Sequence, residues 1–434
     1  MSLLALRNRA FTLKTELGRF APLNRLEREV ILNRADLAVV TETTAERITQ
    51  RAQALSARLR SVGERAFPPT AEKTLRSFTS GEVAQIVGVS DGYLRQLSLD
   101  GLGPTPELSA GGRRSYTLNQ INELREYLAA SRPKEARKFW PRRRPGDKLQ
   151  IITVANFKGG SAKTTTSLYL AQGLALQGFR VLAIDLDPQA SLSAMFGYQP
   201  EFDIPENATL YGAIRYDDER VAMKSVVRPT YFSGISIVPG NLELMEFEHQ
   251  TPRHMLNSRG QPEELFFRRV ARAVADVEEE FDVVVIDCPP QLGFLTMGAL
   301  NAATGMIVTV HPQMVDVASM SQFLLMTSDL ISVIEDAGGK LEYDFLKFLV
   351  TRHDPRDVPE QEIIGLLRDL FGEDVLGATA WKSTAIANAG LTKQSLYELS
   401  RGAVGRSVFD RAMESINGVN EEVVDLIQRV WGRI

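Results

Sequence analysis

A run of lysine, glycine and threonine residues near the middle of the chain has the spacing of an anion-binding loop: Lys158-Gly159-Gly160-Ser161-Ala162-Lys163-Thr164-Thr165. Gly159 and Gly160 permit backbone conformations that other residues avoid, so that successive N–H groups can point toward one anion. Lys163 would bring a mobile positive charge to β- and γ-phosphates, and the Thr164 hydroxyl is placed to bind Mg²⁺. The expected chemistry is binding of a triphosphate together with Mg²⁺.

Carboxylates follow two later apolar segments. Asp185 and Asp187 come directly after the apolar run Val181–Ile184, and Asp287 follows the run Phe281–Ile286. A carboxylate at the end of a buried strand can hold the shell of a bound Mg²⁺ through water, which makes Asp287 a candidate metal-site residue. Asp185 is expected to lie in the strand end and to support the loop.

The elements that must position these residues form a strand–loop–helix–strand unit. Leu149–Ala155 is a short apolar, β-branched run typical of a buried strand, and the apolar residues after Thr166 favour a helix. This βαβ arrangement predicts an α/β fold with a doubly wound, mostly parallel sheet over residues 149–434. Phe157 and Ala162 stand where the standard phosphate loop has glycine, so the loop is a deviant Walker A loop with an extra lysine, Lys158.

The N-terminal 69 residues are predicted to form a helical arm. Apolar residues recur at helical spacing from about Asp36 to Arg65, with arginines between them, and Phe67-Pro68-Pro69 ends the pattern. One amphipathic helix cannot bury its apolar face alone, so we expect it to pack on its own domain or on a second copy of the chain.

Residues 70–134 carry the signals of two short helices and a hairpin. Thr79 and Glu82 form a capping box for the first helix, Gly88 ends it, and Thr117 with Gln120 opens a later helix. The segment resembles the winged helix-turn-helix of MerR-type regulators. The resemblance implies that the second helix faces the DNA major groove through Tyr93, Arg95 and Gln96. It also implies that the hairpin reaches phosphates through Arg113 and Arg114.

Charge and cysteine content limit the function classes. Residues 1–150 contain 26 Lys and Arg against 16 Asp and Glu, whereas the remainder contains 24 against 38, so the N-terminal third is expected to meet a polyanion. Residues 135–148 are predicted to be a basic linker, either bound to phosphates or solvated. The single cysteine, Cys288, excludes a disulfide framework or a thiolate cluster within one chain. No apolar run reaches the roughly 20 residues of a membrane span, so a cytoplasmic protein is expected.

KGGSAKTTT, DLDPQAS and DVVVIDCPP, in this order and spacing, resemble the ParA family of DNA-partition ATPases, in the larger plasmid branch with an N-terminal DNA-binding domain. The resemblance implies a weak, partner-stimulated ATPase that closes into a homodimer around ATP and Mg²⁺. It implies that Asp187 orients the attacking water and contributes to the metal site, that Lys158 acts on the nucleotide of the second subunit, and that His311-Pro312-Gln313 senses the γ-phosphate.

The same resemblance implies two kinds of DNA contact and a protein partner. The N-terminal domain would repress its own operon, and basic residues of the C-terminal half would bind nucleoid DNA without sequence preference, the candidates being Arg352, Lys382, Lys393 and Arg401. A ParB- or RepB-type centromere-binding protein would stimulate hydrolysis. No membrane partner is implied.

Other function classes remain open from the sequence. A MinD-like positioning ATPase would need a basic amphipathic C-terminal helix, but Glu421, Glu422 and Asp425 make the last helix acidic, which favours packing on the core or at a dimer interface. A dinucleotide-dependent oxidoreductase lacks its G-x-G-x-x-G loop here, a kinase would need a substrate lid, and the nitrogenase iron protein needs cysteines. A nucleotide-regulated transcription factor is the remaining alternative, which ATP turnover would distinguish.

Overall fold

The structure, a computed structural model, describes residues 43–66, 73–108, 111–257, 264–339 and 341–434. The chain divides into two compact units, with the boundary after Ala71. In the first unit the described residues form helix α3 (Thr44–Ala66), which confirms the predicted long helix over that part of residues 36–65. Its apolar side chains Ile48 and Leu55 are exposed. The rest of the predicted arm lies outside the described residues.

The second unit is built on an eight-stranded sheet with the order β11-β10-β9-β4-β8-β5-β7-β6. Adjacent strands are parallel except for the edge pair β6 and β7, as the sequence predicted for a mostly parallel sheet. The strands are β4 (Gln150–Ala155), β5 (Val181–Asp185), β6 (Arg228–Pro229), β7 (Ile235–Val238), β8 (Val283–Asp287), β9 (Gly305–Val310), β10 (Phe345–His353) and β11 (Ala380–Trp381).

Helices cover the sheet on both faces and enclose a hydrophobic core on each. Side chains alternate between the faces, so Ile152 and Val154 of β4 belong to one core while Ile151 and Ala155 belong to the other. The helices are α8 (Lys163–Leu176), α9 (Ser191–Met195), α10 (Pro200–Asp203), α11 (Leu210–Ile214), α12 (Met223–Val226), α13 (Leu244–Asn257), α14 (Arg268–Ala275), α15 (Phe294–Ala302), α16 (Met314–Asp336), α17 (Val358–Phe371), α18 (Thr384–Leu391) and α19 (Arg406–Val430).

The two longest helices of this unit differ in how they pack. The C-terminal helix α19 buries Val423 and Ile427 completely, which confirms the expectation that it packs on the core. Helix α16 is long and apolar enough to cross a membrane by length and composition alone. It nevertheless packs Met320 and Phe323 into the core of the sheet domain, as a helix of a globular protein does.

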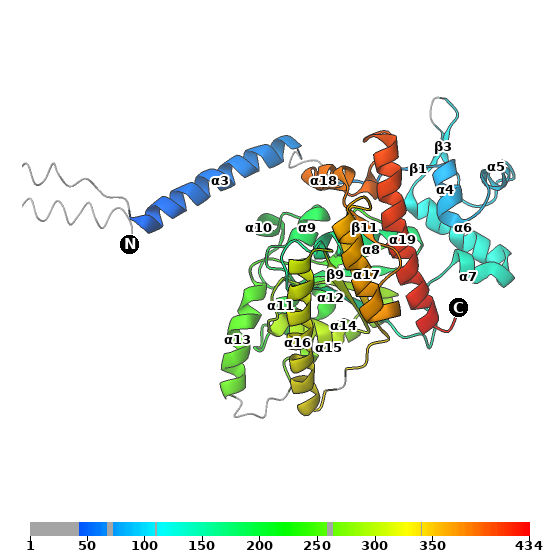
Figure 1. Cartoon of the computed structure of the whole chain (residues 1–434). Helices are drawn as coiled ribbons and strands as arrows, with labels where there is room; N and C mark the ends of the chain where they lie inside the picture. Colours follow the sequence, from blue (N-terminus) through cyan, green and yellow to red (C-terminus); the bar gives the residue numbers. More distant parts are fainter. Residues whose placement is uncertain (1–42, 67–72, 109–110, 258–263, 340) are drawn as a thin grey trace, which may run out of the picture. The chain divides into compact units, whose positions relative to one another are not determined.

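A small N-terminal module precedes the sheet. It contains β1 (Phe78–Thr79), α4 (Ser80–Val87), α5 (Asp91–Leu99), β2 (Glu107–Leu108), β3 (Arg114–Tyr116) and α6 (Leu118–Ser131). Figure 1 labels its three helices and the strands β1 and β3. The order of the three strands is β1-β3-β2. Both predicted capping boxes are present: Thr79 with Glu82 opens α4, and Thr117 with Gln120 opens α6. Gly88 ends α4 in a left-handed conformation, with φ of 74°, as expected of a helix-ending glycine.

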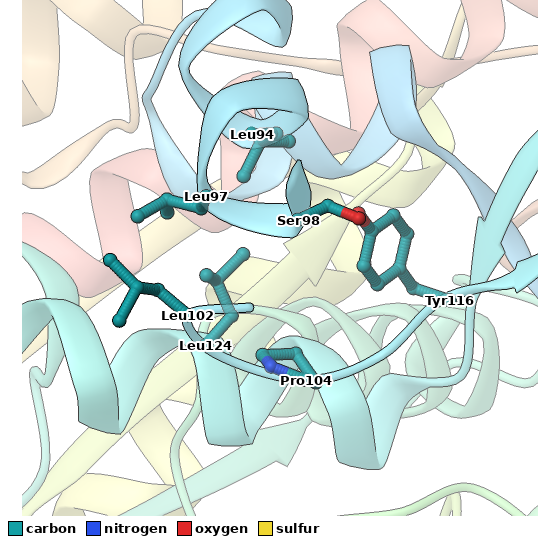
Figure 2. Close-up of a pocket in the computed structure, with 7 residues that line it drawn as sticks. All are labelled: Leu94, Leu97, Ser98, Leu102, Pro104, Tyr116 and Leu124. Atoms are coloured by element: carbon teal, nitrogen blue, oxygen red, sulfur yellow. The ribbon is translucent and has the colours of Figure 1, made fainter. Parts of the chain in front are cut away.

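Figure 2 shows how the second helix of this module is held. Leu94 and Leu97 of α5 line an apolar recess together with Leu124 of α6 and Tyr116 of β3. All four side chains are buried. The opposite face of α5, which carries Arg95 and Gln96, is exposed. The packing therefore fixes which side of α5 faces outward.

The basic segment predicted as a linker is packed against the protein. It contains the short helix α7 (Ala136–Phe139), and the Phe139 ring is fully buried in the core that also contains residues of α4, α6 and α8. Arg143 donates to the Glu278 carboxylate at 2.8 Å, and its backbone N–H donates to Asp282. The segment is therefore not a solvated tether, because its aromatic and arginine side chains have partners in the sheet domain.

Candidate nucleotide-binding site

The glycine-rich loop connects the central strand β4 to helix α8 at the carboxyl end of the parallel strands. Two of its residues have a left-handed backbone: Gly160 with φ of 78° and Ala162 with φ of 68°. Glycine adopts this conformation without cost, whereas alanine does so at about 1 kcal/mol. Ala162 is the N-cap of α8, and no side chain of a described residue caps this helix start. The first N–H groups of α8 have no partner within the helix, so this helix start is able to bind an anion.

Side chains from neighbouring strands hold the carbonyl groups of the loop on its outer side. The Thr351 hydroxyl donates to the Ser161 carbonyl at 3.0 Å, and the Arg352 guanidinium donates to the Gly160 carbonyl at 3.1 Å. Thr309 donates from its hydroxyl to that of Ser161 at 3.0 Å. The carbonyl groups of Gly160 and Ser161 therefore have side-chain partners on β10.

Asn156 fixes the point where the strand becomes the loop. Its side-chain amide donates to the Thr309 carbonyl, and its side-chain oxygen accepts the Lys158 N–H at 2.9 Å. The residue is buried. The loop is thus anchored at its start by an amide and further along by three side chains of β9 and β10.

Lys163 lies at the start of α8 and is buried. Its ammonium donates to the Lys158 carbonyl at 3.1 Å, so the side chain folds back along the loop. Burial lowers the pKa of Lys163, and the nearby carboxylates of Asp287 and Asp187 act in the opposite direction. A phosphate placed in the loop would supply the anionic partner that a buried ammonium group requires.

Asp287 lies at the end of β8, beside the start of α8. Its Oδ1 accepts the Ser167 hydroxyl at 3.0 Å, while Oδ2 is buried and has no hydrogen-bond partner among the described residues. Burial raises the pKa of Asp287, reinforced by Asp185, and the hydroxyls of Thr164 and Ser167 act in the opposite direction. A buried carboxylate oxygen without a partner, next to a threonine hydroxyl, fits the outer ligand shell of a magnesium ion. The predicted metal residues Thr164 and Asp287 are therefore adjacent.

Asp185 and Asp187 have different surroundings, although they are two residues apart. Register pairs Asp185 with Asp287 across β5 and β8. The Asp185 carboxylate accepts both the N–H and the hydroxyl of Ser193, at 2.8 and 2.7 Å, and the Asp187 N–H at 3.2 Å. It supports the loop that follows β5, as expected. Asp187 is half-buried, and its Oδ1 accepts the Gln189 N–H at 2.9 Å.

Lys158 points toward helix α16 within its own chain. Its Nζ lies 2.5 Å from Oδ1 of Asp316, in the first turn of α16. The other oxygen of Asp316 lies 3.7 Å from Nδ1 of His311, whose Nε2 lies 3.9 Å from Glu360. Burial lowers the pKa of His311, and the positive charge of Arg352 adds to this effect. The predicted γ-phosphate segment at His311 is thus close to Lys158 through one shared carboxylate.

Several of these residues were not identified from the sequence: Asn156, Ser167, Thr309, Asp316 and Thr351. All but Ser167 and Asp316 lie at or next to the carboxyl end of β4, β9 or β10, which is where ligand-binding residues of parallel sheets gather. Polar residues at the ends of apolar runs were therefore an available signal. Asp316 had no comparable signal, because its partner Lys158 is far away in the sequence and no local pattern links the two residues.

The five residues predicted to contact DNA through the N-terminal module lie on α5 and at the β2–β3 hairpin. Arg95, Gln96 and Arg113 are exposed. Gln96 donates to Asp100 at 2.8 Å. Tyr93 is half-buried, and the Arg132 guanidinium lies 4.5 Å from its ring centroid, so its ring is partly covered. Arg114 is half-buried in β3.

The four basic residues predicted for non-specific DNA contact lie in different surroundings. Arg352 is exposed, and its guanidinium also contacts the glycine-rich loop. Arg401 forms an ion pair with Asp410. Lys382 is exposed beside the end of β10, and its N–H donates to the His353 carbonyl. Lys393 is exposed and has a left-handed backbone, with φ of 52°.

A mostly parallel sheet, a glycine-rich loop leading from its central strand into a buried helix, and a buried aspartate on the neighbouring strand together define a P-loop nucleoside triphosphatase. Residues 149–337 match the protein family described as AAA domain. A putative replication protein A of Rhizobium rhizogenes is 51% identical over 382 residues, covering 88% of this chain and 94% of that protein.

The chromosome-partitioning ATPase Soj of Thermus thermophilus is 28% identical over 271 residues, covering 62% of this chain and 96% of that protein. A solved structure described as a partition protein shares the fold, with a TM-score of 0.60 at 18% identity, covering 88% of this chain and 99% of that chain. This chain belongs to the ParA family of partition ATPases.

Proposed function

We propose that this chain binds ATP and Mg²⁺ at the loop of residues 156–165 and hydrolyses ATP slowly. The observation that carries the proposal is the buried Oδ2 of Asp287, which has no partner among the described residues, in a carboxyl group close to the Thr164 hydroxyl. Thr164 and Asp287 would hold the ion, with Asp187 at the edge of its shell. Bound Mg²⁺ supplies charge that neutralises the phosphate oxygens during phosphoryl transfer.

The remaining site residues take distinct roles in this proposal. The loop N–H groups of Gly159, Gly160, Ser161 and Ala162, with Thr165, cradle the phosphates, and Lys163 binds the β- and γ-phosphates. Asp187 orients the attacking water. Lys158 leaves Asp316 and reaches the nucleotide of a second subunit, where its charge stabilises the transition state. The proposed active form is therefore a homodimer with two nucleotides.

ATP turnover of the purified full chain tests the enzyme proposal. We expect a low, Mg²⁺-dependent rate that is abolished by Lys163→Ala. Lys224→Ala is the control for removal of a lysine, because this exposed side chain on α12 lies outside the loop and is not a candidate for DNA contact. Absence of turnover in the wild-type chain, measured with and without a centromere-binding protein and DNA, would overturn the proposal and favour a nucleotide-regulated transcription factor.

The biological role that we propose is plasmid partition in the cytoplasm, with the dimer held on nucleoid DNA. The names of the relatives support it: one is a putative replication protein A and another a chromosome-partitioning ATPase. We further propose that ATP-bound dimers bind DNA without sequence preference and that a ParB- or RepB-type protein stimulates hydrolysis and release. Arg352, Lys382, Lys393 and Arg401 remain candidates for this DNA contact, and Arg352 also contacts the loop.

We also propose that the N-terminal module is a winged helix-turn-helix that binds an operator and represses the chain's own operon. Two short helices joined at Gly88, followed by an antiparallel hairpin, support this proposal. Burial of Leu94 and Leu97 leaves Arg95 and Gln96 of α5 outward, where base edges and phosphates would be met. Helix α3, whose exposed apolar residues need a partner, would contribute to dimer formation.

A further inference from the structure

Arg125 of α6 is a buried arginine that bonds to three separate helices. Its residue is 2% exposed. The guanidinium donates to the Ile86 carbonyl at 2.7 Å, to the Leu176 carbonyl at 3.0 Å and to the Phe139 carbonyl at 3.4 Å. None of the ion pairs among the described residues involves Arg125. A buried cation is therefore surrounded by backbone carbonyls.

Each of these carbonyls belongs to the last turn of its helix. Ile86 lies near the end of α4, Phe139 ends α7 and Leu176 ends α8. The carboxyl ends of helices carry partial negative charge, so the three dipoles together compensate the guanidinium. Burial lowers the pKa of Arg125 to about 10, which leaves the side chain charged at neutral pH. Separating the guanidinium from these carbonyls would leave a buried charge without partners, which would destabilise the fold.

Helix α8 connects this arginine to the glycine-rich loop. Lys163 begins the helix at the loop, and Leu176 ends it at Arg125. Every side chain from Thr166 to Leu176 is buried, so the helix has little room to bend. Over 14 residues it spans about 21 Å. A small displacement of its first turn would therefore reach its last turn as movement of a rigid body.

A second polar connection joins the N-terminal module to the same helix. Lys73, which precedes β1, forms an ion pair with Glu398 at 2.9 Å. The same glutamate accepts a hydrogen bond from the Gln172 side chain of α8 at 3.3 Å. Both side chains of the ion pair are largely buried, at 11% and 2% exposed. Of these two connections, only the one through Arg125 contacts α4 directly.

We infer that Arg125 couples the phosphate loop to the helix pair α4 and α5. Binding of nucleotide displaces the first turn of α8, and Arg125 transmits the displacement to the end of α4. The inference rests on the proposed function, because it requires nucleotide to bind in the loop. Linkage makes the effect reciprocal, so a ligand that binds α4 and α5 changes the affinity for nucleotide by the same factor. Arg125 is a positioning residue rather than a catalytic one.

Amide hydrogen exchange of the full chain tests this inference. The probe is a non-hydrolysable ATP analogue with Mg²⁺, and the readout is the change in exchange rate that the analogue causes in residues 80–99. In the wild-type chain we expect a change of about fivefold or more, alongside protection of residues 156–170. In Arg125→Gln and Arg125→Lys we expect residues 156–170 to remain protected while the response of residues 80–99 is lost.

The two variants and a control separate coupling from loss of structure. Arg125→Lys keeps the positive charge but cannot reach three carbonyls at once. It therefore tests the coupling if Arg125→Gln does not fold. The control is Arg142→Gln, because Arg142 donates to the Gly178 carbonyl at 2.9 Å, two residues beyond α8. We expect this control to keep the wild-type response in residues 80–99.

Each other outcome has a defined meaning. No protection of residues 156–170 in the wild-type chain overturns the proposed nucleotide site, and the inference with it. Protection of the loop without any response of residues 80–99 overturns the coupling alone. A response that persists in Arg125→Lys, or that is lost equally in Arg142→Gln, shows that Arg125 is not the route.

Discussion

The ammonium group of Lys158 lies 2.5 Å from the Asp316 carboxylate of the same chain. The lysine side chain is 38% exposed and the aspartate side chain 9%. In the proposed function, Lys158 would serve the nucleotide of a second subunit, which it cannot reach while it is paired with Asp316. We therefore expect the ion pair to oppose association of two chains.

Asp316→Asn is expected to favour association in the presence of ATP. A partly exposed ion pair contributes about 1 kcal/mol and the dimer would break two of them, so their loss should lower the protein concentration needed for dimer formation by roughly thirtyfold. Sedimentation with a non-hydrolysable ATP analogue measures this shift. Lys158→Ala is the opposite variant, and it should bind nucleotide but remain monomeric. Unchanged association in Asp316→Asn would show that the ion pair does not restrain the lysine.

Ala162→Gly is expected to stabilise the chain without nucleotide. The left-handed backbone at Ala162, with φ of 68°, is free of strain for glycine, and the gain should be about 0.5–1 kcal/mol in the free energy of unfolding. Ala162→Val should lower stability instead, because a β-branched side chain tolerates this conformation less well. Urea unfolding followed by circular dichroism compares the three proteins. Equal midpoints would contradict a left-handed residue 162.

Ser167→Ala is expected to lower the affinity for Mg²⁺, so that ATP turnover needs a higher Mg²⁺ concentration. Its hydroxyl donates to Asp287 Oδ1, and loss of such an outer contact typically lowers metal affinity by about tenfold. Titration of ATP turnover with Mg²⁺ gives the affinity. Ser319→Ala is a matched control, since the Ser319 hydroxyl donates to the carbonyl four residues earlier on α16, as Ser167 does on α8. An unchanged Mg²⁺ titration in Ser167→Ala would remove Asp287 from the metal site.

Acidification below about pH 6.5 is expected to destabilise the chain through His353. Burial lowers the pKa of His353, whose ring nitrogens contact Thr379 at 3.1 Å and Gln361 at 3.2 Å. The unfolded chain then takes up a proton at higher pH than the folded chain, so stability is present above the ordinary histidine pKa and is lost as the pH falls below it.

The slope for one such group cannot exceed about 1.4 kcal/mol per pH unit. His353→Gln should therefore flatten the dependence of the unfolding midpoint on pH between 7 and 5, leaving the share due to His311, whose pKa is lowered as well. His249→Gln, at an exposed position, controls for the substitution. A profile in His353→Gln as steep as that of the wild type would exclude His353 as its source.

Combined replacement of Arg95, Arg113 and Arg114 by alanine is expected to abolish operator binding while ATP turnover is retained. These residues lie on α5 and at the hairpin, outside the glycine-rich loop. Electrophoretic mobility shifts with operator and random DNA, without nucleotide and with ADP or ATP, measure the loss. The C-terminal variant Arg401→Ala should keep operator binding. Operator binding that survives the triple replacement would show that the N-terminal module does not recognise the operator.

Local patterns predicted much of this fold. The capping boxes at Thr79 and Thr117, the end of α4 at Gly88 and the strand–loop–helix unit around Lys163 are encoded by residues close together in the chain. Asp287 could be placed because a carboxylate that follows a buried apolar run must lie at a strand end. These features depend on nearest neighbours, which a sequence displays directly.

Long-range pairings could not be predicted in this way. Lys158 meets Asp316, and Arg125 meets Leu176, across separations that no local pattern encodes. Residues 135–148 are basic and proline-containing, like a tether, but Phe139 and Arg143 find partners only once the sheet domain exists. Composition described this segment correctly and still gave the wrong expectation for its packing.

The burial of Phe139 bears on how this protein can be divided. A fragment ending near residue 134 would lose the ring that fills the space between α6 and α8, and a fragment starting at residue 149 would expose the apolar surface beneath it. Either fragment would expose apolar surface to water and is therefore expected to aggregate. Experiments on DNA recognition therefore need the chain from residue 73 to its end, and a protease site engineered at residues 139–141, where Phe139 and Pro141 are buried, should resist cleavage until the whole unit unfolds.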